Sequence, residues 1–223
     1  MTMVKICGLA NAENAIAAAS AGADFIGLVF APSRRQVSVE KALWIVEEVK
    51  KLDKQPLIAG VFVNVKAKEV NRVSAYCKLD RVQLSGDESW QYCLDIECPV
   101  IKVIHITAEM KTGQVIKEIE TGYSMGLKQK PICLLDTKVG NAYGGSGRVF
   151  DWRLAAEVSA KHQVIVAGGL NSQNVGELMR QVKPWGVDVS SGVESDGAKT
   201  RRKIKAFIKA VRRVDKEVKD ATG

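Results

Sequence analysis

The sequence has 223 residues, of which 46% are hydrophobic and 26% are charged, and its formal net charge is +8 at pH 7. This composition is typical of a globular protein with a sizeable core. No apolar run reaches the roughly 18 residues of a membrane helix, and the N-terminus lacks the pattern of a signal peptide, so we expect a cytoplasmic protein.

Eight short apolar runs predict β-strands. They cover residues 3–7, 24–30, 57–63, 81–84, 100–106, 131–136, 163–168 and 186–190. Helical patterns lie between them, and four of these follow residues suited to an N-cap, namely Asn11, Ser38, Asp151 and Asn171. Eight strand–helix units in one domain, residues 1–223, favour a (β/α)8 TIM barrel. A doubly wound open sheet is the alternative, but the GxGxxG turn that usually follows an early strand in that fold is missing.

The basic charge is concentrated in the last predicted helix, at about residues 198–218. From Lys199 to the C-terminus ten basic residues face three acidic ones. Ile204, Phe207, Ile208 and Val211 recur there at helical spacing, which predicts an apolar stripe docked on the body and a solvated basic face. Because no aromatic residues alternate with the basic ones, we expect no nucleic-acid partner.

Side chains alternate along a strand, so the polar members of these runs share the face that points into the barrel. A core rarely accepts several unpaired polar groups, since each costs several kcal/mol. Active sites of such barrels lie at the C-terminal ends of the strands, and a polar site there is the simpler interpretation. The residues predicted to point inward are Lys5, Cys7, Arg81, Gln83, Ser85, Asp136, Asp188 and Ser190.

Two glycine-containing turns follow the last two strands. AGGLN contains Gly168 and Gly169, and SSGVE contains Ser190, Ser191 and Gly192. Barrel enzymes often bind phosphate with these two loops, because glycine lets backbone N–H groups approach the anion. The pair of turns therefore predicts a phosphate site.

A long irregular segment, TKVGNAYGGSGRVF, follows Asp136. We expect it to form a mobile loop over the pocket and Gly145 to contact the substrate. The five cysteines include no CxxC pair, and the two histidines complete no metal-ligand spacing. We therefore expect no disulfide and no metal.

Eight motifs together resemble the phosphoribosylanthranilate isomerase family of tryptophan biosynthesis. In chain order they are VKICGL, SRRQVS, GVFVN, VQLSG, LLDT, YGGSGRVFDW, VAGGLNSQNV and GVDVSSGVE, spanning Val4 to about Phe207. The family converts N-(5-phosphoribosyl)anthranilate to 1-(2-carboxyphenylamino)-1-deoxyribulose 5-phosphate by an Amadori rearrangement, an aldose–ketose isomerisation.

The resemblance implies that Cys7 is the general base and Asp136 the general acid. It also implies Arg35 near the anthranilate carboxylate and the phosphate on the last two loops. Two groups suffice for the chemistry, so no cofactor is expected. A free thiol has a pKa near 8.5 and would benefit from the charge of Lys5, whereas the pKa of Asp136 must be raised; opposed environments are therefore predicted.

Ser85 departs from the family, which commonly has histidine at this position. Serine can still form hydrogen bonds, but its side chain is shorter than that of histidine and cannot carry a charge near pH 7. His105 on the next strand is a candidate substitute, although its parity is opposite to that of Lys102, so only one of these two can face the barrel interior without a bulge.

Two alternatives stay open at this point. One is the related phosphoribosyl isomerase of histidine biosynthesis, which uses an aspartate where this chain has Cys7. The other is a non-catalytic sugar-phosphate-binding barrel. In each case the expected partner is a small phosphorylated molecule, and the expected assembly is a monomer or homodimer.

Overall fold

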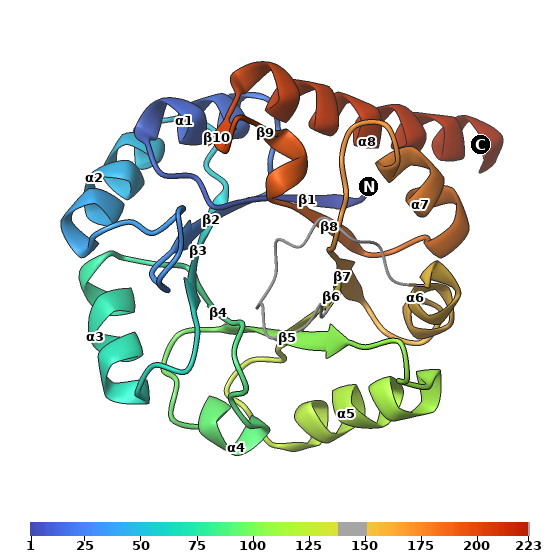
Figure 1. The fold of residues 1–223 in the computed structure, drawn as a ribbon, viewed down its shortest axis with the longest axis horizontal. Helices are drawn as coiled ribbons and strands as arrows, with labels where there is room; N and C mark the ends of the chain where they lie inside the picture. The colour runs from blue at the N-terminus through green and yellow to red at the C-terminus, as the bar shows by residue number, and fades with distance from the viewer. Residues whose placement is uncertain (138–150, 223) are drawn as a thin grey trace.

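A computed structural model of the chain describes residues 1–137 and 151–222. Eight parallel strands form a closed barrel in chain order, and helices surround it (Figure 1). The strands are β1 (Met3–Cys7), β2 (Phe25–Val29), β3 (Leu57–Phe62), β4 (Arg81–Leu84), β5 (Val100–Ile106), β6 (Ile132–Thr137), β7 (Val164–Val166) and β8 (Gly186–Val189). The predicted fold class and all eight predicted strands are confirmed.

A helix follows each strand. The helices are α1 (Ala12–Ser20), α2 (Val39–Lys50), α3 (Ala67–Tyr76), α4 (Trp90–Cys93), α5 (Thr112–Ser124), α6 (Trp152–Ser159), α7 (Val175–Val182) and α8 (Arg201–Thr222). The N-caps at Asn11, Ser38 and Asp151 are confirmed, because each side chain accepts a backbone N–H of the first turn.

The predicted start of α7 is wrong. Asn174, not Asn171, is the N-cap. The Asn171 side chain instead accepts the backbone N–H groups of Gln173 and Asn174, so it closes a turn that precedes the helix.

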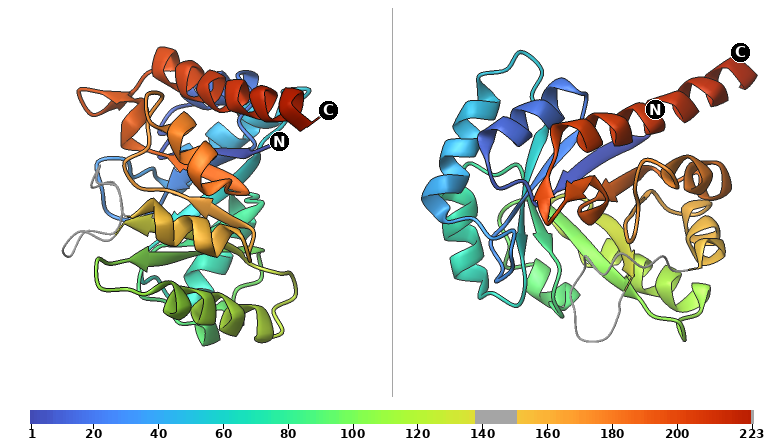
Figure 2. Two further views of the ribbon diagram at one scale, coloured as in Figure 1. Left: turned by 90° about the vertical axis from the view of Figure 1, so that its right-hand side faces the viewer. Right: turned by 45° about the horizontal axis from the view of Figure 1, so that its top comes forward.

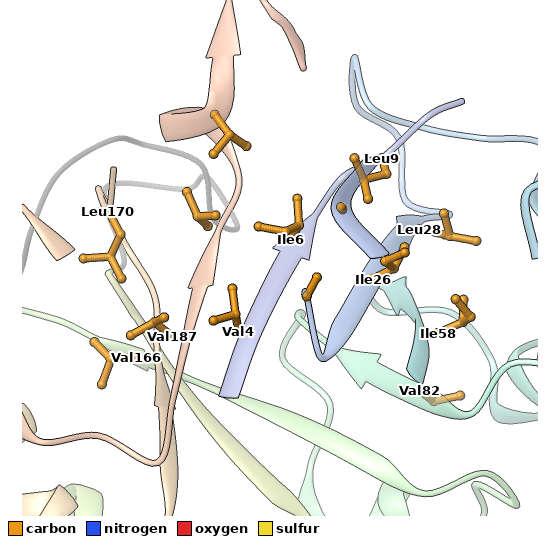
Figure 3. Close-up of a cluster of buried hydrophobic side chains, with 14 of the residues drawn as sticks. Val4, Ile6, Leu9, Ile26, Leu28, Ile58, Val82, Val166, Leu170 and Val187 are labelled. Atoms are coloured by element: carbon orange, nitrogen blue, oxygen red, sulfur yellow. The ribbon is translucent and has the colours of Figure 1, made fainter. Parts of the chain in front are cut away.

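The core has two layers, set by the alternation along the strands. One layer fills the space between strands and helices; Figure 3 shows part of it, including Val4, Ile6, Ile26, Val82 and Val187. The other layer comprises Ala59, Ile101, Val103, Leu134, Ile165 and Ala167, whose parity places them inside the barrel. This inner layer fills the barrel below the site, and the cavity described below opens at the C-terminal ends of the strands.

The basic helix α8 has its apolar stripe buried, as predicted: Ile204, Phe207, Ile208 and Val211 are 0–2% exposed. It begins at Arg201, because the preceding residues form a 3-10 turn, η1 (Ser191–Val193), and a small hairpin of β9 (Glu194–Ser195) and β10 (Ala198–Lys199). Figure 2 shows α8 running past the edge of the barrel. No helix in the described part of the chain is both long and apolar enough to cross a bilayer.

Polar contacts join α8 to the start of the barrel. The Arg212 guanidinium pairs with Asp24 at 2.9 Å and donates to the carbonyls of Thr2 and Gly22. Asp215 accepts the Thr2 hydroxyl at 2.7 Å. The first strand and the last helix are thus fastened to each other where β1 pairs with β8.

Candidate active site

A cavity of about 370 Å³ opens at the C-terminal ends of the strands. Seven of the residues predicted from the sequence line it, namely Cys7, Arg35, Gln83, Ser85, Asp136, Asp188 and Ser190. The lining of the cavity also includes His105 and an apolar wall of Val29, Ala31, Val61 and Val63. The inward parity assigned to β1, β4, β6 and β8 from the sequence is therefore confirmed.

Lys5 lies beneath the cavity and forms a buried ion pair. Its side chain is fully buried, and Nζ donates to Asp188 Oδ1 at 3.0 Å from the paired position on β8. Burial alone would lower the pKa of Lys5, but attraction to Asp188 and Cys7 outweighs it and raises the pKa above the usual lysine range. Lys5 is therefore a permanent cation under the site and is not among the residues that line the cavity.

Cys7 ends β1 opposite Gly27 of β2, and this neighbour has to be glycine. A Cβ atom at position 27 would lie 2.8 Å from Cys7 Sγ and 3.2 Å from Lys5 Nζ. Burial raises the pKa of the Cys7 thiol, and the charges of Lys5 and Lys199 only partly offset this effect. Lys5 lowers the pKa of this thiol, as expected, but the prediction of opposed environments for Cys7 and Asp136 is wrong, because burial is the larger effect and raises the pKa of both.

Asp136 is the penultimate residue of β6, with β7 and β8 between this strand and β1. Burial and the negative charge of Asp188 raise its pKa to about 7, although the backbone N–H of Thr137 and the charge of Lys5 act in the opposite direction. The predicted rise is confirmed. Such a carboxyl group can donate a proton near neutral pH.

The end of β4 carries a small polar network. Gln83 Nε2 donates to Ser85 Oγ at 3.0 Å, and His105 Nε2 lies 3.0 Å from the Ser85 carbonyl oxygen. A carbonyl only accepts, so Nε2 of His105 carries the hydrogen in this contact. Lys102, three residues earlier, acts electrostatically on Glu118 of α5 and therefore faces the helices. No bulge is needed for His105 to reach the pocket.

Arg35 lines the cavity and is held from outside by Glu194. Its Nε and Nη2 donate to the two carboxylate oxygens of Glu194 at 2.7 and 3.1 Å. Lys199 joins the same carboxylate at 2.8 Å. Sequence reasoning missed Glu194 and Lys199. The signal was present, because Asp196–Gly197 between them is a typical two-residue hairpin turn, and both residues adopt positive φ values of +50° and +79°.

The two predicted phosphate loops approach each other closely. A Cβ atom at Gly192 would lie only 1.9 Å from the Leu170 carbonyl oxygen, so only glycine fits there. Gly168 and Gly169 adopt φ values of +89° and +64°, which favour glycine. Among the described residues, the backbone N–H groups of Gly169 and Leu170 find no acceptor. Backbone donors are thus available to an anion between Gly169 and Ser191.

Gly145 lies outside the described residues, as does most of the expected loop over the pocket. Within residues 1–137 and 151–222, no group of three His, Cys, Asp or Glu side chains is arranged to hold a metal ion.

Comparisons with known proteins agree on one family. The sequence model of N-(5′-phosphoribosyl)anthranilate isomerase matches residues 4–210. The enzyme of that name from Dehalococcoides mccartyi is 50% identical over 96% of this chain and 98% of its own length. The crystal structure of the Thermotoga maritima enzyme is 35% identical, with a TM-score of 0.81 over 95% of this chain and 99% of that one. A further crystal structure holds reduced 1-(o-carboxyphenylamino)-1-deoxyribulose 5-phosphate; it is 34% identical with a TM-score of 0.78 over 95% of this chain and 99% of that one.

Proposed function

The chain belongs to the phosphoribosylanthranilate isomerase family, and we propose that Cys7 is the base and Asp136 the acid of the reaction this family catalyses. The reaction converts N-(5-phosphoribosyl)anthranilate to 1-(2-carboxyphenylamino)-1-deoxyribulose 5-phosphate in tryptophan biosynthesis. One observation carries the assignment: the two side chains line one cavity from strands separated by two others. A sugar bound between them would meet an acid on one side and a base on the other.

The chemistry proceeds in three steps. Asp136 gives its proton to the ring oxygen of the ribose as the C1–O bond breaks, and the nitrogen lone pair forms a C1=N iminium cation. That cation makes the C2 proton acidic, and the Cys7 thiolate removes it to give an enol amine. Gain of a proton at C1 and loss of the C2 hydroxyl proton then yield the 2-ketone, and over the cycle Cys7 gives up the proton it took and Asp136 regains the one it gave. General acid–base catalysis of this kind contributes about 10²- to 10⁴-fold per group.

The buried cations favour the base. Lys5 and Lys199 both lower the pKa of Cys7 relative to burial alone, so each stabilises the thiolate when it forms. Asp188 keeps Lys5 in place through one carboxylate oxygen, Oδ1. Asp188 also lines the cavity, where its carboxylate can accept a sugar hydroxyl.

The remaining pocket residues bind the two ends of the substrate. Arg35 would receive the anthranilate carboxylate, while Gln83 and Ser85 would hydrogen-bond the polar atoms between the rings. The phosphate would lie between the loops at Gly168–Gly169 and Ser190–Gly192, on backbone N–H groups. The apolar wall of Val29, Val61 and Val63 suits the aromatic ring.

Steady-state turnover of N-(5-phosphoribosyl)anthranilate tests the assignment. Cys7→Ser and Asp136→Asn should each lower kcat by at least about 100-fold and change KM little, since each removes a group used only in the chemical step. Cys98→Ser and Asp53→Asn are matched controls away from the cavity and should keep full activity. Near-normal turnover of Cys7→Ser would refute the assignment of the base.

We also expect a small phosphorylated molecule to be the principal partner. The Thermotoga maritima enzyme is described as dimeric. For this chain a monomer or a homodimer is expected, in the cytoplasm, and light scattering after size-exclusion chromatography measures which one forms.

A further inference from the structure

Glu194 is a buried carboxylate on which three cations converge. It is 7% exposed and lies on β9, directly after the second phosphate loop. Arg34 approaches Oε2 at 2.7 Å, Arg35 approaches Oε1 at 2.7 Å, and Lys199 approaches Oε1 at 2.8 Å. Burial would raise the pKa of Glu194, but the hydrogen bonds from Arg35 and Lys199 lower it to about 2. The residue is thus an anion at any pH where the enzyme works.

Lys199 connects this carboxylate to the phosphate loop. An ammonium group has three N–H donors, and Lys199 Nζ has three acceptors. They are Glu194 Oε1 at 2.8 Å, the Ser190 carbonyl at 2.8 Å and the Ser190 hydroxyl at 3.1 Å. The Lys199 side chain is 5% exposed, so every bond it makes is shielded from water.

Arg35 is fixed at both ends of its side chain. Its Cδ lies 2.6 Å from the position that a Cβ of Gly8 would occupy, so the aliphatic stem rests directly on that glycine. At the other end, Nε and Nη2 form a fork with Glu194. Within the described part of the chain, Nη1 makes no hydrogen bond, which leaves this amino group for a ligand in the cavity that Arg35 lines.

The charges of the cluster do not cancel. Three cations surround one carboxylate, so a surplus of positive charge stays at the mouth of the pocket. An anionic substrate gains from that surplus, while the single anion keeps the cations in a fixed arrangement.

We propose that Glu194 is a positioning residue that aims Arg35 at the substrate carboxylate and, through Lys199, ties Arg35 to Ser190 of the phosphate loop. The inference rests on the proposed role of Arg35 in binding that carboxylate. It adds that one connected ionic network holds both the carboxylate end and the phosphate end of the substrate. Glu194 is the centre of this network and contacts neither end.

A double-mutant cycle tests the proposal with Glu194→Gln, Arg35→Met and the combination. Each single variant should raise KM for N-(5-phosphoribosyl)anthranilate about tenfold or more, the loss typical of one charge-assisted hydrogen bond, and leave kcat within about threefold. The KM of the double variant should stay close to that of Arg35→Met and well below the product of the two single losses, because Glu194 acts mainly through Arg35 and only the smaller effect through Lys199 is left. Glu217→Gln is the matched control, since Glu217 also pairs with two arginines but lies on the outer face of α8.

Three results would decide against the proposal in different ways. An unchanged KM in Glu194→Gln, or losses that multiply in the double variant, would overturn the positioning role and leave the role of Arg35 intact. An unchanged KM in Arg35→Met would overturn the carboxylate-binding role itself, and with it this inference. If Glu194→Gln does not fold, Glu194→Asp replaces it. The shorter side chain keeps the charge but cannot accept both hydrogen bonds from Arg35, so it should raise KM in the same way.

Discussion

Cys7 on β1 and Asp136 on β6 face one cavity, and burial raises the pKa of both side chains. Asp136 reaches about 7, and Cys7 rises above the ordinary thiol value. Most free enzyme molecules above pH 7 therefore hold a carboxylate and a neutral thiol. The reactive pair, a protonated acid and a thiolate base, is a minority form whose population follows pH in a defined way.

The first prediction concerns the pH profile of wild-type kcat/KM. It should rise up to about pH 7, stay level up to the pKa of Cys7 and fall above it. Below pH 7, Asp136 is protonated and each pH unit gives ten times more thiolate. Above pH 7, the loss of protonated Asp136 cancels that gain. Initial rates at subsaturating substrate from pH 5.5 to 10 measure the profile.

The single variants assign each limb of that profile to a residue. Residual activity of Asp136→Asn should keep rising beyond pH 7, since only the thiolate is then required. Residual activity of Cys7→Ser should fall above pH 7. All three enzymes share one substrate, so its own ionisation cancels in their ratios. A level profile for Asp136→Asn between pH 7 and 9 would mean that the two roles are reversed.

The second prediction concerns the ion pair under the pocket. Lys5→Met should lower the free energy of unfolding by about 3–5 kcal/mol, because Asp188 would keep a buried charge without its partner. The double variant Lys5→Met/Asp188→Asn should recover part of this loss but not the activity. Urea unfolding measures the first effect and turnover the second. Equal stability of wild type and Lys5→Met would contradict the prediction.

The third prediction concerns Gly27. Gly27→Ala should lower kcat at least about tenfold, since its methyl group would lie 2.8 Å from Cys7 Sγ and must displace the thiol. Gly113→Ala in α5 is the control, because a Cβ there meets no atom within 4 Å. The rate of Cys7 alkylation by iodoacetamide should change in the first variant only. Full activity of Gly27→Ala would exclude this packing constraint.

The fourth prediction concerns His105. Its Nε2 contact with the Ser85 carbonyl holds the end of β4, and its ring lines the cavity. His105→Ala should therefore lower kcat/KM about tenfold, the typical worth of a hydrogen bond in a buried site. His162→Ala, which changes the only other histidine, should have no effect. Unchanged turnover of His105→Ala would remove this residue from the site.

The fifth prediction concerns the phosphate loops. Gly192→Ala would place a methyl group 1.9 Å from the Leu170 carbonyl oxygen and force the two loops apart. KM for the substrate and the inhibition constant of inorganic phosphate should both rise, while kcat changes less. Gly176→Ala in α7 meets only ordinary contacts of 3.4 Å and is the control. Unaltered inhibition by phosphate would place the anion elsewhere.

Much of the site could be predicted from two general rules, the alternation of side chains along a strand and the meeting of strand ends at one end of a barrel. Strand alternation places Cys7, Gln83 and Asp136 on one face, and the barrel brings the ends of their strands together. The same alternation separates His105 from Lys102 once the strand is known to lack a bulge. These assignments need no knowledge of side-chain packing.

The rest depends on long-range contacts that a sequence pattern does not contain. Glu194 meets Arg35 across 159 positions of the chain, and the hairpin that presents it is only two residues long on each strand. The pKa of Cys7 follows from a balance between burial, Asp188 and two lysines, and the sequence pointed to Lys5 but neither to Lys199 nor to the depth of burial. Asn174 and not Asn171 is the N-cap of α7, because the Asn171 side chain accepts the backbone N–H groups of Gln173 and Asn174 in the preceding turn.

The fastening of β1 to α8 bears on how the protein is made. Thr2 and Asp215 meet across 213 positions, and β1 pairs with β8. During synthesis one edge of the first strand therefore stays unpaired until β8 has left the ribosome. Contacts so distant in sequence slow folding and leave an open sheet edge exposed to other chains. Arg212 and Asp215 thus complete a closure that can form only after α8 has been translated.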